Sequence, residues 1–298
     1  MSGSCRSVLF ALVLSVLSIL IVTSSTVEAQ SQASCTFKFF QLDSSNTPFE
    51  ANGVNDYQTV VGQVFTSTSK GFIRYSGGGV SYFAAPNSAT TSFLARNDSG
   101  INVGFYSTQG ANSNISKGFI LQGSTFTSFV HPKAVWGTAL SGINKYNSTV
   151  GWYADSAENV HGFKRFSNGG LVALDFPGGQ FTQPAGINDS GAIVGSFSDS
   201  IGEHGFLYHG GSWARVDYPG APGTTQVTGI SNANVIVGFS TSTEPSIAFL
   251  YANGVFKVIS VPNSFNTIVQ GMAPGGMITG KTLPNGSSTA NGFTATCN

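Results

Sequence analysis

The sequence predicts an all-β protein: a six-bladed β-propeller of four-stranded blades, with the ring closed by an N-terminal strand that pairs with the last blade. Three observations support this fold class. A motif recurs six times at intervals of about 44 residues, the composition disfavours helices, and two cysteines lie near opposite ends of the chain. A repeat of this length is typical of one propeller blade.

The composition favours strands and turns over helices. Of the 298 residues, 38 are glycine and 24 are phenylalanine, whereas only 9% are charged. Ser, Thr and Asn are frequent, and the helix-favouring residues Glu and Lys are scarce. Because 41% of the residues are hydrophobic, the chain is too apolar to be disordered.

The charge balance bears on the class of partner. The chain has 13 basic and 13 acidic residues, so its formal net charge is zero. Such a chain has no positive field with which to hold a phosphate backbone. We therefore expect no nucleic-acid partner.

The N-terminal segment is typical of a signal peptide. Arg6 precedes an apolar run over residues 8–22, and Ala29 ends a small-residue cleavage motif before Gln30. The run is shorter than the roughly 20 residues that a spanning helix needs. We expect a signal peptide over residues 1–29, a single propeller domain over residues 30–298 with no membrane span, and a secreted or periplasmic protein.

The cysteines point to a disulfide rather than to a metal site. Removal of the signal peptide takes Cys5 with it and leaves Cys35 and Cys297 near the two ends of the mature chain. In an oxidising compartment two such cysteines are expected to pair. Neither has a histidine or a second cysteine at metal-ligand spacing, so we expect no metal and no cofactor.

Three markers recur in a fixed order through the domain. The first is a phenylalanine that usually follows glycine, at Phe72, Phe119, Phe163, Phe206, Phe249 and Phe293. The second is a glycine after a short apolar run, at Gly62, Gly104, Gly151, Gly195, Gly238 and Gly280. The third is a proline, at Pro86, Pro132, Pro177, Pro219 and Pro262. The repeats start near residues 53, 95, 142, 186, 229 and 271.

Each repeat can be divided into four strands. Residues 227–230 represent a first strand. The turn that follows a first strand is represented in the preceding repeat by residues 188–191, with a second strand over residues 192–197 and a third over residues 204–208. A glycine pair at residues 210–211 then turns the chain into a fourth strand over residues 213–218, which Pro219 ends. A four-stranded unit is too small to be stable alone, so the recurrent Phe, Ile and Val are expected to pack between blades.

The last repeat lacks its fourth strand, and the N-terminus supplies a candidate. The repeat stops after its third strand at the C-terminus, while residues 36–43 resemble the fourth strand at residues 171–175. The N-terminal strand is therefore expected to complete the last blade. A Cys35–Cys297 disulfide would then join adjacent strands, and closing so long a loop is worth about 4–5 kcal/mol in the chain-entropy account.

The strongest repeats resemble a known family. The segments at residues 186–195 (GINDSGAIVG), 204–207 (HGFL) and 216–221 (VDYPGA) are similar to the bacterial extracellular repeat called the HAF family. The resemblance extends over residues 35–298, although the histidine occurs in only two of six repeats and the alanine is usually glycine. It implies an exported bacterial repeat protein and carries no catalytic residues.

The charged residues of the loops form a candidate ligand site. Antiparallel strands place the loops after second and fourth strands on one face, and the sparse charge is concentrated there. The candidate ligand-binding residues are Trp136, Asp155, Glu158, His161, Asp199, Glu203 and His204. Trp136 could stack on a sugar or pack between blades. The alternative for the charged residues is that they prefer exposed hairpins and that the histidines brace the scaffold.

The Asn-x-Ser/Thr motifs are interpreted as turn chemistry. They occur at Asn97, Asn114, Asn147, Asn188 and Asn285. Asparagine, serine and glycine are the residues that turns favour, so such motifs arise there without any link to glycosylation.

Two functions remain open. The first is an exported, non-catalytic propeller that binds an extracellular polysaccharide or a cell-surface protein through one loop face. The alternative is a secreted glycan hydrolase or lyase that uses Asp155, Asp199 and Glu203 as acid and base. The common hydrolase, metalloprotease, phosphate-loop and EF-hand motifs are absent from the sequence. An enzyme would need the carboxylates to converge on one pocket, with a perturbed pKa.

Overall fold

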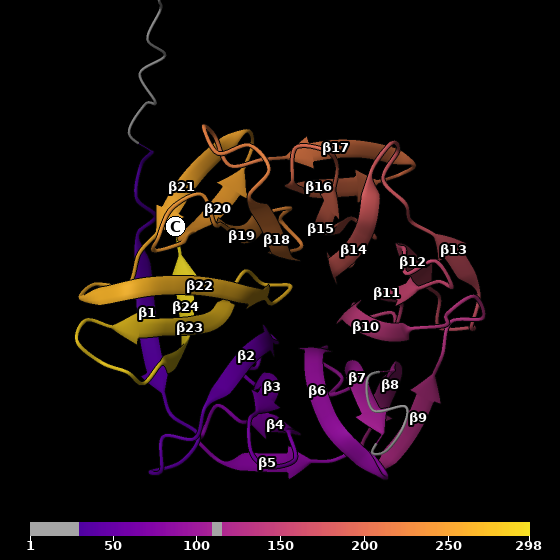
Figure 1. The fold of residues 1–298 in the computed structure, drawn as a ribbon. Coiled ribbons are helices and arrows are strands. Elements are labelled where there is room, and N and C mark those ends of the chain that lie inside the picture. Colours follow the sequence, from indigo (N-terminus) through magenta and orange to yellow (C-terminus); the bar gives the residue numbers. More distant parts are fainter. Residues whose placement is uncertain (1–29, 109–114) are drawn as a thin grey trace, which may run out of the picture.

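The computed structural model describes residues 30–108 and 115–298. The predicted signal peptide and the motif at Asn114 lie outside these residues. The described residues form strands β1 to β24 and contain no helix, so none is present there that could cross a membrane. The sheets are arranged around a common axis as in a propeller, with the first strand of each sequence repeat nearest the centre (Figure 1). The prediction of an all-β propeller is confirmed.

Four of the sheets contain four antiparallel strands each. One consists of β2 (Phe49–Val54), β3 (Val60–Val64), β4 (Lys70–Arg74) and β5 (Val80–Phe83). The next consists of β14 (Gln180–Ile187), β15 (Ile193–Ser198), β16 (Glu203–His209) and β17 (Ser212–Val216). Another consists of β18 (Thr225–Ile230), β19 (Ile236–Ser240), β20 (Ile247–Ala252) and β21 (Val255–Ile259).

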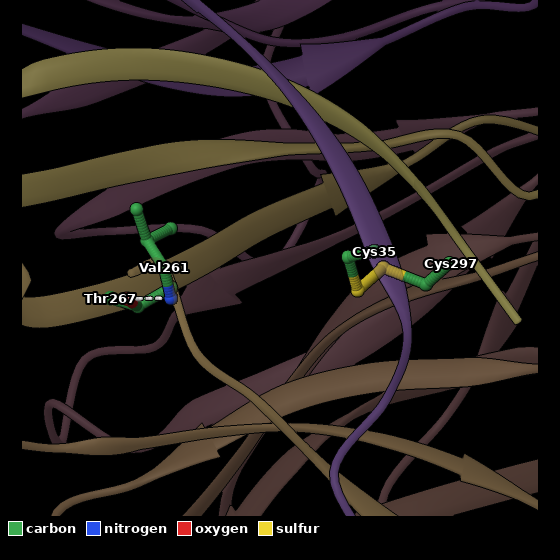
Figure 2. The surroundings of a disulfide bond; sticks show 4 residues. All are labelled: Cys35, Val261, Thr267 and Cys297. Carbon is green, nitrogen blue, oxygen red and sulfur yellow. Dashed lines mark hydrogen bonds between the residues drawn. A yellow bond between two sulfur atoms is a disulfide. The ribbon is translucent and has the colours of Figure 1, made fainter. Parts of the chain in front are cut away.

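The fourth of these sheets combines the two ends of the chain. It consists of β22 (Ser264–Met272), β23 (Ile278–Pro284), β24 (Asn291–Cys297) and β1 (Cys35–Phe40). Figure 1 shows the indigo β1 beside the yellow β24, and the two strands are antiparallel with Cys35 opposite Cys297. These cysteines form a disulfide (Figure 2), which confirms the predicted pairing.

The remaining strands form one eight-stranded sheet. It consists of β6 (Ser88–Arg96), β7 (Asn102–Thr108), β8 (Ser116–Gln122), β9 (Thr125–Phe129), β10 (Gly137–Ile143), β11 (Thr149–Ala154), β12 (Val160–Arg165) and β13 (Leu171–Ala173). One parallel residue pair, Gly137 with Ser116, joins its two halves. Parallel bridges of this kind also link separate sheets, at Ser69–Thr90 and Glu203–Thr224.

The recurrent phenylalanines form the core between sheets. All six are fully buried, and each belongs to a different hydrophobic cluster. Phe206, for example, packs with Val150 of β11 and Ile193 of β15, so its cluster draws on two neighbouring four-stranded units. The predicted role of these residues as inter-blade core agrees with this packing, because burial of such rings is a main source of folding free energy.

The recurrent glycines of the second strands face a bulge in the first strands. In every repeat the pairing between the first two strands shifts by one residue, as at Ala51/Gly53 against β3. The bulge brings a first-strand carbonyl against the glycine. A Cβ on Gly62 would lie 1.8 Å from the Glu50 oxygen, and at the other five glycines the distance would be 1.9–2.2 Å. Only glycine fits there.

A buried threonine holds each of five connections between fourth and first strands. Its Oγ1 accepts a hydrogen bond from a backbone N–H six or seven residues earlier, as Figure 2 shows for Val261 and Thr267. The five pairs are Ala85–Thr91, His131–Thr138, Phe176–Thr182, Tyr218–Thr225 and Val261–Thr267. This threonine does not stand out in the sequence, since threonine is common in strands for other reasons.

The turn asparagines connect neighbouring repeats. The Oδ1 of each accepts an N–H within its own turn, and the Nδ2 donates to a carbonyl of the next repeat. This donor series runs Asn55 to Asn97, Asn97 to Asn144, Asn144 to Asn188, and Asn188 to Ser231. Asn97 and Asn188 are 2% and 1% exposed, so these two motifs serve turns, as expected, and not glycan attachment.

Candidate ligand-binding face

One side of the molecule carries the loops that follow the second and fourth strands, and we call it the loop face. The parallel bridges identify it, because each joins the start of a third strand to the start of the next first strand. The turns between first and second strands lie on the opposite face. All seven predicted ligand-binding residues belong to loops or strand ends of the loop face.

The His161 side chain is held between two carboxylates. Its Nε2 lies 3.3 Å from Asp155 Oδ2, and its Nδ1 lies 3.1 Å from Asp175 Oδ2. Burial acts to lower the pKa of His161, but the two carboxylates outweigh it and raise the pKa above its ordinary value. The ring also stacks on Tyr153, which in turn stacks on His131 at a centroid distance of 3.8 Å.

The Asp155 carboxylate closes its own loop. Its Oδ1 accepts the N–H groups of Ala157 and Asn159 at 2.8 and 3.0 Å. Burial acts to raise the pKa of Asp155, but these bonds and the His161 ring outweigh it, so the pKa is below its ordinary value. Glu158, exposed in the same turn, has a positive φ of 65°. These contacts are those of a structured tight turn.

His204 repeats the arrangement in the next sheet. Its Nε2 lies 3.0 Å from Asp199 Oδ1 and its Nδ1 lies 3.0 Å from Asp217 Oδ2. Arg215 Nε donates to the same Asp217 oxygen at 2.8 Å, and the His204 side chain has no exposed surface. The Ile201 N–H is the main cause that lowers the pKa of Asp199. Both nitrogens of this ring are engaged within the protein.

Glu203 links two neighbouring sheets through its hydrogen bonds. Its Oε2 accepts a hydrogen bond from Gln226 Nε2 at 2.8 Å, and its backbone N–H donates to the Gly223 carbonyl. Burial raises the pKa of Glu203, and the Gln226 bond opposes the change. Asp199 and Glu203 both interact with His204, whereas Asp155 interacts with His161 of the preceding repeat. No hydrogen bond among the described residues joins these three carboxylates to one another.

Half-exposed aromatic rings are a second feature of the loop face. Trp136 is 49% exposed, on the connection between β9 and β10. Three phenylalanines on the same face, Phe65, Phe181 and Phe265, are 42%, 45% and 47% exposed. These three were not predicted from the sequence, which contains 24 phenylalanines, although their positions outside the Gly-Phe marker distinguish them from the core set.

A cavity of about 590 Å³ opens between the sheet of β2–β5 and the sheet of β1 and β22–β24. We call it the junction cavity. Phe65 and Phe265 both line it, together with Glu50, Glu244 and Lys281. A second, central cavity of about 410 Å³ is lined by the first strands of the sheets and shares Glu50 and Lys281 with the first.

An ion pair forms part of the wall of both cavities. Lys281 Nζ donates to Glu50 Oε1 at 2.6 Å, and Gln270 Nε2 donates to Glu50 Oε2 at 2.9 Å. None of the seven predicted ligand-binding residues lines either cavity. Within residues 30–108 and 115–298, no three His, Cys, Asp or Glu side chains are placed to hold a metal ion.

Comparisons with known proteins support the fold and no finer identity. No protein-family description matches the chain, and no curated protein sequence matches it. The HAF resemblance therefore stays a resemblance.

Several solved structures share the fold. A virginiamycin B lyase from Staphylococcus aureus has a TM-score of 0.53 and 12% identity, covering 88% of this chain and 99% of that one. AofleA from Arthrobotrys oligospora has a TM-score of 0.52 and 12% identity, covering 87% and 86%. The SapL1 lectin, solved with alpha methyl fucoside, has a TM-score of 0.51 and 12% identity, covering 80% and 89%. At these identities the similarity establishes a β-propeller fold.

Proposed function

We propose that the protein is an exported, non-catalytic propeller that binds an extracellular polysaccharide through its loop face. The observation that supports this most is the set of half-exposed rings on that one face: Phe65, Trp136, Phe181 and Phe265. Export rests on the predicted signal peptide over residues 1–29 and is consistent with the disulfide. A cell-surface protein is the competing partner.

The proposed architecture is a ring of six four-stranded blades. We count the eight-stranded sheet as two blades, because a single residue pair joins its halves and similar bridges link sheets that are otherwise separate. We assign β1 as the fourth strand of the last blade, which closes the ring. Six sequence repeats and six hydrophobic clusters support this count.

Exposed aromatic rings beside polar loop side chains favour a carbohydrate ligand. A flat apolar ring packs against the C–H face of a sugar, and the Ser, Thr and Asn side chains of the loops offer donors and acceptors to hydroxyl groups. The SapL1 lectin, a protein of similar fold solved with alpha methyl fucoside, is compatible with this function. The zero net charge of the chain also suits a ligand without strong charge.

The hydrolase or lyase alternative has weaker support. Asp155 and Asp199 have lowered pKa values, so neither is suited to donate a proton near neutral pH. Glu203 has a raised pKa, but its side chain is bonded to Gln226 and lines neither cavity. A general acid must reach the leaving-group oxygen.

A pull-down on insoluble and soluble polysaccharides tests the proposed function. The secreted protein should be retained without release of sugars into the supernatant. Substituting both Trp136 and Phe181 by alanine should weaken retention about thirtyfold, since each ring contributes of the order of 1 kcal/mol. Tyr146→Ala, which removes an exposed ring in the turn between β10 and β11 on the opposite face, is the control.

Two results would contradict this proposal. Release of reducing or unsaturated sugars would favour the enzyme. Failure to bind any polysaccharide would favour a protein partner.

A further inference from the structure

We propose that the junction cavity is the binding site for neutral pyranose units of the polysaccharide. The inference rests on the proposed function and deepens it, because it names the site and the chemical class of sugar. This site differs from the one predicted from the sequence at the seven candidate ligand-binding residues of the loop face. Four features of the cavity support the assignment: its size, the two aromatic rings that line it, the ion pair in its wall and its net charge.

The size and position of the cavity suit a sugar ligand. Its volume of about 590 Å³ lies within the range of about 300–1,000 Å³ common for small-molecule sites. Its walls come from the connection between β1 and β2, the start of β2, the end of β3, the start of β22, the end of β23 and the loop between β23 and β24. The loop between β19 and β20 adds Glu244 from a third sheet. Figure 1 shows β2 and β23 side by side around this junction, and their contact holds the walls together.

Two apolar rings line the cavity without being covered by the protein. Phe65 follows β3 and Phe265 lies near the start of β22, so they come from the two sheets that form the junction. Both remain nearly half exposed, whereas Phe49 beside them is buried. Exposed rings that line a concave site are suited to stacking against the C–H groups of a pyranose.

The ion pair supplies both kinds of hydrogen-bonding group at fixed positions. A pyranose hydroxyl can donate to the Glu50 carboxylate while a neighbouring hydroxyl accepts from the Lys281 ammonium. Gln270 holds the same carboxylate from its other oxygen, so the pair is positioned before a ligand arrives. Asn266 also lines the cavity, and its Oδ1 is buried without a hydrogen-bond partner among the described residues.

The charge of the cavity selects against acidic sugars. Its charged lining residues are the carboxylates Glu50 and Glu244 and the ammonium of Lys281, a formal sum of −1. Since Lys281 is already paired with Glu50, it offers no free positive charge to a uronic acid. A sugar carboxylate would instead be repelled by Glu244. The cavity therefore favours neutral pyranoses over uronic acids.

Calorimetric titration of the secreted protein with defined oligosaccharides tests this inference. The probes are neutral gluco-, manno- and xylo-oligosaccharides and, as the acidic counterpart, oligogalacturonate. At least one neutral probe should bind more tightly than oligogalacturonate. Phe65→Ala and Phe265→Ala should each weaken that binding about fivefold, the effect of losing about 1 kcal/mol of ring stacking. Tyr57→Ala, an exposed ring in the turn between β2 and β3 on the opposite face, should leave it unchanged.

A charge variant gives a readout that a structural role would not produce. Glu244→Gln removes the carboxylate that repels an acidic sugar and leaves the rings in place. It should narrow the preference for neutral over acidic probes severalfold at low salt, and less at high salt. Thermal unfolding of each variant checks that the fold is retained.

The outcomes separate the two proposals. If a neutral oligosaccharide binds and the Trp136/Phe181 double variant weakens it while Phe65→Ala and Phe265→Ala do not, the junction site is overturned and the proposed function stands. A preference for oligogalacturonate would also overturn the assignment of neutral sugars. If no oligosaccharide or polysaccharide binds, both proposals fail.

Discussion

The two histidines of the loop face lie where the sequence predicts them, but their side chains bond to neighbouring carboxylates of the protein. His161 and His204 occupy equivalent positions of successive repeats, and each has both ring nitrogens beside carboxylates. Such a ring, at the start of the third strand, joins the loop after the second strand to the residues that follow the fourth strand. The arrangement agrees with the scaffold alternative, while ligand binding by these residues stays a prediction.

The raised pKa of His161 predicts a pH-dependent contribution to stability. A pKa raised by folding contributes stability that is fully present below the unfolded pKa, about 6.5, and is lost as pH rises through the folded pKa. The lowered pKa of Asp155 contributes stability that is present above 3.8 and lost as pH falls through its folded pKa. The two contributions therefore overlap between about pH 4 and 6.5.

The variant His161→Asn tests this window. The difference in melting temperature between wild type and variant should be larger at pH 5.5 than at pH 8.5, because the charged histidine interacts with Asp155 and Asp175 only at the lower pH. His209→Asn, at the exposed end of β16, serves as the control and should show no such change. Equal differences at both pH values would show that the His161 ring acts only as a neutral hydrogen-bonding group.

The first two strands of every repeat explain, at the scale of elements, why the glycine marker recurs. The bulge places a backbone carbonyl where a Cβ would have to be, so the glycine is required by its partner strand and not by its own φ. The repeat was visible in the sequence. Its cause was not, because a bulge is a property of two paired strands.

Gly195→Ala should be strongly destabilising. The added Cβ would lie 2.2 Å from the Gln183 oxygen, and neither backbone can move without breaking the pairing of β14 and β15. We expect a loss of at least about 3 kcal/mol in the free energy of unfolding, measured by urea denaturation. Gly77→Ala is the matched control, since nothing lies within 4 Å of that Cβ, and it should change stability by less than about 0.5 kcal/mol. Similar effects at both glycines would refute the bulge explanation.

At the scale of the whole molecule, the N-terminal segment ties distant parts of the chain together. Before entering β1 it hydrogen-bonds to β21, where the Ala33 N–H donates to the Val258 carbonyl and the Val258 N–H donates to the Ser31 carbonyl. It then pairs with β24, and the disulfide joins the two strands at Cys35 and Cys297. Separating β1 from β24 would open the proposed ring and expose the hydrophobic cluster around Phe293.

Removing the disulfide should cost much of the stability of the whole domain. The cysteines are 262 residues apart, and closing such a loop destabilises the unfolded chain by about 5.5 kcal/mol in the chain-entropy account. The double variant Cys35→Ser/Cys297→Ser, and wild type unfolded in reductant, should both lose stability of this order in urea denaturation. A loss of less than about 1 kcal/mol in the free energy of unfolding in both cases would mean that strand pairing alone holds β1 against β24.

The sequence alone determined the all-β propeller fold, the strand order within a repeat and the disulfide. These features depend on local periodicity, on turn residues and on the count of cysteines, all of which are written along the chain. Only the tertiary structure shows which side chains are engaged within the protein and where cavities lie. Asp155 and Asp199 fold back onto their own loops, because short polar side chains bond the nearest N–H groups. The junction cavity instead joins residues as far apart as Glu50 and Lys281, which only packing of the last sheet against the first brings together.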